Sequence, residues 1–94
     1  MLDSTVLPRV KLQELGADEL TDLELIMVFV GNGCNGYDYR AISKDLLLLI
    51  HRVGVNNLTL NCIRSVKGLG LAKASALFAM IELYKRYSLI AMCI

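Results

Sequence analysis

The fold of this chain is decided by residues 63–74, which read IRSVKGLGLAKA. Two glycines, Gly68 and Gly70, enclose a single apolar residue, Leu69, in a triplet that we call the glycine hairpin. Glycines at these two positions permit backbone conformations that a Cβ disfavours, so the chain can reverse within a few residues. Leu69 between them can turn inward and fix the hairpin to the core. Apolar residues continue at helical spacing on both sides, which predicts a helix, a tight hairpin and a second helix.

The N-terminal segments carry clear signals for where helices start and stop. Proline suits the first turn of a short helix over residues 8–15, and Gly16 is placed to end it. Thr21 and Glu24 form a capping box, which predicts that a helix over residues 22–30 begins there. That helix is apolar almost all round, so we expect it to be the buried one.

Three further helices are predicted in the rest of the chain. Asp38 is a good N-cap for a helix that runs to Val53 and is stopped by Gly54. A short helix follows over residues 59–66, and the last helix spans residues 71–87. Its predicted core stripe is Ala74, Leu77, Phe78, Ile81 and Tyr84. Its predicted solvated residues are Lys73, Lys85 and Arg86.

These elements predict an all-α fold, a compact bundle of about five short helices containing a helix-hairpin-helix element. The glycine-rich segment 31–36 also lies between two helices, which suggests a pseudo-repeated double hairpin of the SAM/helix-hairpin-helix kind. We expect residues 1–94 to form a single helical domain. It divides into the first helices and glycine-rich hairpin (8–53), the helix-hairpin-helix (54–87), and an apolar tail or truncated linker (88–94).

Composition favours an intracellular globular protein. Apolar residues make up 55% of the 94 residues, which excludes a disordered chain. The three widely spaced cysteines suit a reducing compartment rather than a disulfide scaffold. The start of the chain lacks a signal peptide, and the apolar runs are shorter than a membrane span. We therefore predict a cytoplasmic location and no membrane partner.

The near-neutral net charge of +1 hides a strong asymmetry along the chain. Residues 1–38 carry seven acids and two bases, a net charge of −5, whereas residues 39–94 carry eight bases and two acids, a net charge of +6. This polarity suggests an anionic partner for the second part. The alternative is that the two parts simply attract each other.

The glycine hairpin is the candidate site for such a partner. Backbone amides of a tight hairpin and of the helix turn after it point outward together, and they bind anions such as nucleic-acid phosphates. Nearby basic side chains can add charge, and contacts of this kind grip the DNA backbone without reading its sequence. The alternative is a plain tight connection between two helices. The predicted DNA-backbone contacts are Arg64, Lys67, Gly68, Leu69, Gly70, Ala72 and Lys73.

No arrangement of side chains in the sequence predicts an enzyme. His51 is the only histidine and has no acid, serine or cysteine at a useful spacing. The paired acids near Asp18 and Asp22 sit at helix starts, where they favour the helix dipole. We expect no catalytic residue, no metal site, no cofactor and no small-molecule substrate.

The sequence resembles the N-terminal helical domain of the bacterial RadC proteins, which is described as containing a helix-hairpin-helix motif. The resemblance covers residues 8–86 and is carried by PRVKL (8–12), LTDLEL (20–25), ELYKR (82–86) and the 63–74 stretch. It implies a helix-hairpin-helix DNA-binding module in a family labelled as DNA repair. It also implies that longer relatives continue into a metal-dependent hydrolase domain of the MPN/JAB type, whose ligands have no counterparts in this chain.

The chain departs from that family at two places. Gly31, Asn35 and Tyr37 stand where relatives place basic residues in the first hairpin, and Leu71 replaces a common proline. The first departure argues against a second phosphate clamp, so we expect low affinity for DNA. The rival prediction is a protein-interaction module that docks on the absent hydrolase domain or on a second copy, favoured by the apolar tail and the alanine-rich last helix.

Overall fold

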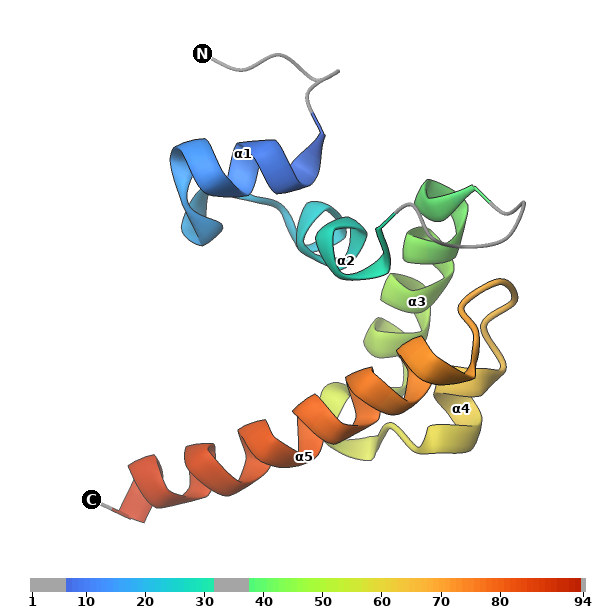
Figure 1. Ribbon diagram of the computed structural model, residues 1–94. Coiled ribbons are helices and arrows are strands. Elements are labelled where there is room, and N and C mark those ends of the chain that lie inside the picture. The colour runs from blue at the N-terminus through green and yellow to red at the C-terminus, as the bar shows by residue number, and fades with distance from the viewer. Residues whose placement is uncertain (1–6, 32–37, 94) are drawn as a thin grey trace.

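The structure, a computed structural model, describes residues 7–31 and 38–93, with side chains up to Ser88. All regular structure in these residues is helical (Figure 1), so the predicted all-α class is confirmed. The helices are α1 Pro8–Leu15, α2 Asp22–Val30, α3 Tyr39–Val53, α4 Leu60–Arg64 and α5 Leu71–Cys93. The last helix is much longer than the short helices expected, at 23 residues.

The helices pack in two consecutive pairs, α2 on α3 and α4 on α5. Short 3-10 turns, Ala17–Glu19 and Val55–Asn57, lead from α1 to α2 and from α3 to α4. The predicted second hairpin at residues 31–36 lies almost wholly outside the described residues, so the pseudo-repeat remains a prediction.

Local capping sets the predicted bounds of the first three helices, and these bounds are confirmed. The Asp38 carboxylate accepts a hydrogen bond from the Arg40 amide at 3.0 Å and starts α3. α3 ends at Val53. The next residue, Gly54, has a φ of 88°, which lies outside the right-handed helical region. The predicted short helix is shorter than expected, because α4 ends at Arg64 and the chain then enters a series of turns.

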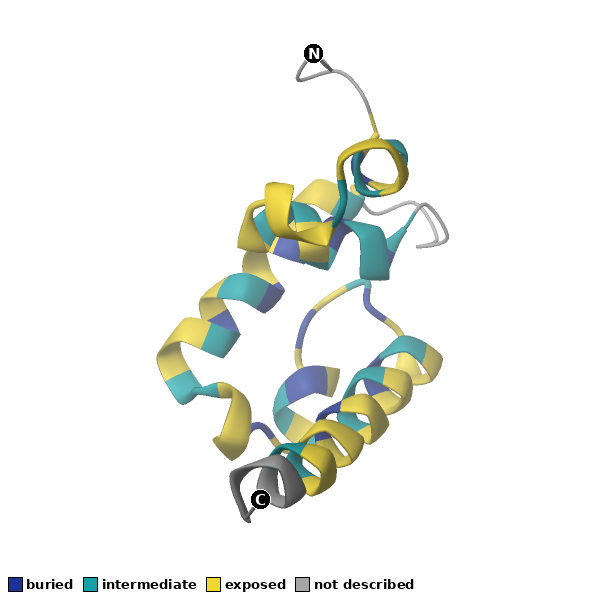
Figure 2. Cartoon of the chain, turned by 90° about the vertical axis from the view of Figure 1, so that its left-hand side faces the viewer, coloured by how far each residue is buried: buried dark blue, intermediate teal, exposed yellow. Residues whose placement is uncertain are grey.

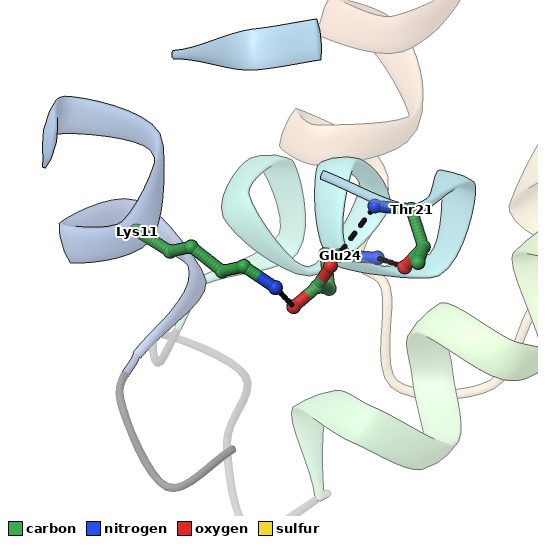
Figure 3. Close-up of polar contacts among 3 residues, drawn as sticks. All are labelled: Lys11, Thr21 and Glu24. Carbon is green, nitrogen blue, oxygen red and sulfur yellow. Dashed lines mark hydrogen bonds and ion pairs between the residues drawn. The ribbon is translucent and has the colours of Figure 1, made fainter. Parts of the chain in front are cut away.

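The capping box of α2 also ties α1 to the rest of the molecule (Figure 3). Thr21 Oγ1 accepts from the Glu24 amide at 3.2 Å, and Glu24 Oε1 accepts from the Thr21 amide at 2.9 Å. The second carboxylate oxygen pairs with Lys11 Nζ at 2.8 Å. The hydrogen bond from Lys11, followed by the one from the Thr21 amide, lowers the pKa of Glu24.

The core lies where α3 meets α4, the glycine hairpin and the first half of α5 (Figure 2). Its buried residues are Val30, Ile42, Leu46, Leu49, Leu58, Ile63, Val66, Leu69, Ala74 and Ile81. Burial of each large side chain stabilises the fold by about 1.5–3 kcal/mol. Three of them, Ile42, Leu46 and Leu49, lie on one face of α3 at helical spacing.

The prediction that α2 is the buried helix is wrong. Only Met27 and Val30 on α2 are buried, whereas Leu25 is 40% exposed. α1 and α3 are the helices that pack on α2, and two neighbours leave part of a short apolar helix open to solvent.

The predicted core stripe of α5 is wrong at Tyr84, which is 63% exposed. Lys85 instead lies half-buried along the core side, and its ammonium donates to the Asn56 carbonyl at 3.0 Å. Arg86 is solvated as predicted and pairs with Glu82. α5 continues beyond the predicted end to Cys93, but no helix in the described residues has the length and hydropathy to cross a membrane.

The lowered pKa of Glu24 predicts a pH-dependent part of stability. A carboxyl whose pKa is lower in the folded state stabilises the fold above its unfolded pKa, about 4.3, and this contribution is lost as pH falls through the folded value. We expect Glu24→Gln to reduce the free energy of unfolding at pH 7 but to have little effect at pH 3. Urea unfolding of the wild type, Glu24→Gln, Lys11→Met and the double variant isolates the Lys11–Glu24 coupling. A coupling equal at both pH values would contradict the prediction.

Candidate nucleic-acid interface

The glycine hairpin is fixed to the core by its middle residue. Leu69 is 3% exposed and lies in the core with Ile63 and Val66, so the prediction that Leu69 turns inward is confirmed. Gly68 and Gly70 have φ angles of 85° and 83°. A Cβ on Gly70 would meet no atom within 4 Å, so the backbone angle alone, not space, requires glycine there.

Local hydrogen bonds define the approach of the chain to the hairpin. The Thr59 hydroxyl accepts from the Cys62 amide at 3.2 Å and begins α4. At its other end the Ser65 hydroxyl donates to the Cys62 carbonyl at 2.6 Å. The Leu69 amide donates to the Val66 carbonyl at 3.3 Å. The turn is therefore held by its own backbone before any ligand arrives.

The N-terminus of α5 presents amide donors beside the hairpin. The Ala74 amide donates to the Gly70 carbonyl at 3.0 Å and closes the first turn. The amides of Leu71, Ala72 and Lys73 precede this bond, so the helix itself gives them no acceptor. Leu71 and Ala72 are both exposed, which leaves the approach open. A helix start of this kind attracts anions.

Two of the predicted cations lie just before the hairpin along the chain. Arg64 and Lys67 are exposed, and within the described part of the chain neither is paired with an acid. Lys67 also borders an open hollow of about 290 Å³ between α3 and residues 65–67, which precede the hairpin. The hollow is lined by Asp45, Leu48, Leu49, Arg52, Ser65, Val66 and Lys67.

Arg52 is the residue that sequence reasoning missed. It lies in the last turn of α3, and only the packing of α3 beside residues 65–67 brings it to the same hollow as Lys67. No local spacing signals this neighbourhood. Asp45 lines the same hollow, so its negative charge partly cancels the positive charges of Arg52 and Lys67.

Lys73 was predicted to be solvated and to contact phosphate, and its ammonium points elsewhere. Lys73 Nζ donates to the Phe29 carbonyl at 2.9 Å and lies 5.5 Å from the centre of the Phe29 ring. It therefore donates to a carbonyl at the C-terminus of α2. The last carbonyls of a helix have no partners within the helix and attract cations. The side chain is half-buried and bonds the second helical pair to the first.

Sequence comparison assigns the family. The pattern of the UPF0758 N-terminal family matches residues 2–75, from before α1 into the first turns of α5. The chain belongs to the UPF0758 N-terminal family. The glycine hairpin lies inside the matched segment, and the sequence resemblance is confirmed at this level.

The family relatives are longer proteins. A UPF0758 protein of Aquifex aeolicus is 39% identical over 83 residues, which are 85% of this chain and 34% of the relative. A UPF0758 protein of Xanthomonas euvesicatoria is 39% identical over 89 residues, 90% of this chain and 38% of the relative. The chain thus spans about a third of the length of the curated relatives it matches. No solved structure matches it.

The described residues of this UPF0758 N-terminal domain contain no cluster of three or more potential metal ligands. Cys62 is a free thiol, partly buried against the core. Its hydrogen bond to Thr59 lowers the pKa of the Cys62 thiol. Cys34 and the side chain of Cys93 lie outside the described residues.

The position of Lys73 predicts a structural role that Lys67 does not share. Lys73→Met keeps most of the aliphatic stem but removes the hydrogen bond to Phe29 and the contact with its ring. We expect a loss of about 1 kcal/mol in the free energy of unfolding, below the usual range of about 1.5–3 kcal/mol for a charged hydrogen bond because the site is partly solvated. Lys67→Met is the matched control, with an expected change within about 0.5 kcal/mol. Urea unfolding of both variants tests this, and equal stabilities would refute it.

Proposed function

We propose that this domain is a non-catalytic module that binds the DNA backbone through the glycine hairpin. The observation that carries the proposal is the burial of Leu69, because it fixes the hairpin to the core beside the exposed N-terminus of α5. Amides of that start would donate hydrogen bonds to one phosphate. Arg64 and Lys67 would reach the same phosphate or its neighbour, and Arg52 would add charge from α3.

Such binding is expected to be weak and independent of sequence. Backbone contacts carry no base information. With three cations on phosphates, the logarithm of affinity should fall with a slope of about −2.7 against the logarithm of salt, or roughly fortyfold between 50 and 200 mM. The dissociation constant should lie in the non-specific range of about 10⁻⁴ to 10⁻⁶ M.

Several features agree with this function. Lys73 is engaged with Phe29, so the positive charge at the site is modest, as weak binding requires. Exposed acids cluster near the start of α2, at Asp18, Glu19 and Asp22, and would turn that end of the domain away from DNA. The setting implied by a DNA partner and the free Cys62 thiol is the bacterial cytoplasm.

A second candidate function is protein interaction, favoured by exposed apolar side chains on α5. The RadC resemblance implies that longer relatives continue into a hydrolase domain. In such proteins the exposed face of α5 could dock on that domain. The exposed residues of α5 point more directly to another occupant, a second copy of the domain.

A matched pair of charge reversals tests the DNA proposal. Lys67→Glu and Arg9→Glu change the net charge equally, but Arg9 lies on α1, away from the hairpin. We expect the wild type to bind labelled single- and double-stranded DNA in a salt-dependent manner by fluorescence anisotropy. Lys67→Glu should weaken binding about tenfold or more and flatten the salt slope by about 1, whereas Arg9→Glu should stay within about threefold of the wild type.

Circular dichroism must first show that both variants are folded. Absence of wild-type binding at low salt would refute the proposal. So would equal weakening by the two reversals, because the effect would then reflect net charge and not the hairpin.

A further inference from the structure

α5 presents an apolar face on the side opposite the core. Ala74 and Ile81 point into the core, and the residues half a turn away from them are exposed. We call this set the outer face of α5; its members are Ala72, Ala76, Ala79, Met80, Leu83 and Tyr87. Figure 2 shows exposed residues along this side of the helix. Met80 is 59% and Tyr87 66% exposed, although both are large apolar side chains.

The side chains of the outer face are ordered by size along α5, so the small half of one copy can face the large half of an antiparallel copy. Its three small residues lie toward the start of α5 and its three large residues toward the end. In an antiparallel pair of copies, Ala72 meets Tyr87, Ala76 meets Leu83, and Ala79 meets Met80. All three pairs share one centre, between residues 79 and 80. A parallel pair would instead set large residues against large and alanine against alanine.

The same residues form two ridges with i, i+4 spacing, one through positions 72, 76 and 80 and one through 79, 83 and 87. Reversal about the common centre exchanges the two ridges. Ridges of one helix can therefore fit the grooves of its copy, and the alanines allow close approach of the two axes. Twofold symmetry of this kind also closes the assembly at two copies.

We propose that a second copy of the domain packs against the outer face of α5, antiparallel, with the twofold axis between residues 79 and 80. Charge does not oppose this contact. No member of the outer face is ionisable apart from the Tyr87 phenol, and the flanking Glu82 and Arg86 already form an ion pair at 3.0 Å.

The available area fits a reversible dimer. The exposed part of the outer face amounts to roughly 500 Å² per copy, so a dimer would bury about 1,000 Å², the lower bound for a specific interface. A patch of that size is also at the upper end of what a monomer leaves open. We expect a dissociation constant of the order of 10 µM.

Sedimentation equilibrium across about 1 to 200 µM tests the dimer without reference to DNA. Ala76→Glu sets a charge on the outer face, and Ser75→Glu sets the same charge on the next exposed residue, off that face. The wild type and Ser75→Glu should dimerise alike, whereas Ala76→Glu should raise the dissociation constant at least about tenfold. A monomeric wild type at the highest concentration would overturn the proposal and leave the face to another occupant, such as a following domain. Equal dimerisation of the two variants would also overturn it.

Disulfide trapping tests the antiparallel order. In a background with Cys34, Cys62 and Cys93 changed to alanine, Ala72→Cys should form no dimer with itself. Ala72→Cys mixed with Tyr87→Cys should form the mixed disulfide on mild oxidation, because the two positions face each other. Rapid self-linking of Ala72→Cys would indicate a parallel pair and refute the proposed arrangement.

Discussion

Burial of Leu69 is the constraint from which the geometry of the candidate site follows. Once this side chain lies in the core, the residues on both sides must take positive φ angles, and both are glycines. The turn then starts α5 close against the core, where Ala74 is fully buried and a larger residue would hold the helix away. The open amides of α5 and the direction of Lys73 are consequences of that start.

Lys73 shows how tertiary contacts redistribute charge. The carbonyl end of α2 needs a cation or a donor, and Lys73 supplies both with one ammonium group. A lysine in the first turn of a helix that follows a glycine hairpin would otherwise be an obvious phosphate contact. In this fold the cations left for the proposed phosphate contact are Arg64 and Lys67, with Arg52 from α3, so the proposed binding is weak.

α5 illustrates the opposite problem, a helix with more apolar surface than one core can cover. The core takes one side of it, so the outer face stays exposed. This surplus is why Tyr84 fits a helical core stripe in the sequence yet is solvated, while Lys85 lies half-buried and bonds to Asn56. When a helix has apolar residues on more than one side, its sequence does not indicate which side faces the core. The proposed second copy would pack on this exposed surplus, away from the hairpin.

The sequence by itself determined the features that depend on near neighbours along the chain. The Thr21–Glu24 capping box, the Asp38 cap and the glycine stops set the bounds of α1 to α3, because each signal acts within one helical turn. The inward turn of Leu69 was predictable for the same reason. Only the tertiary structure decided the partner of Lys73, the position of Arg52 and Lys67 at one hollow, and the side of α5 that faces the core. These depend on helices distant in sequence packing together, and no local spacing encodes which residues that packing joins.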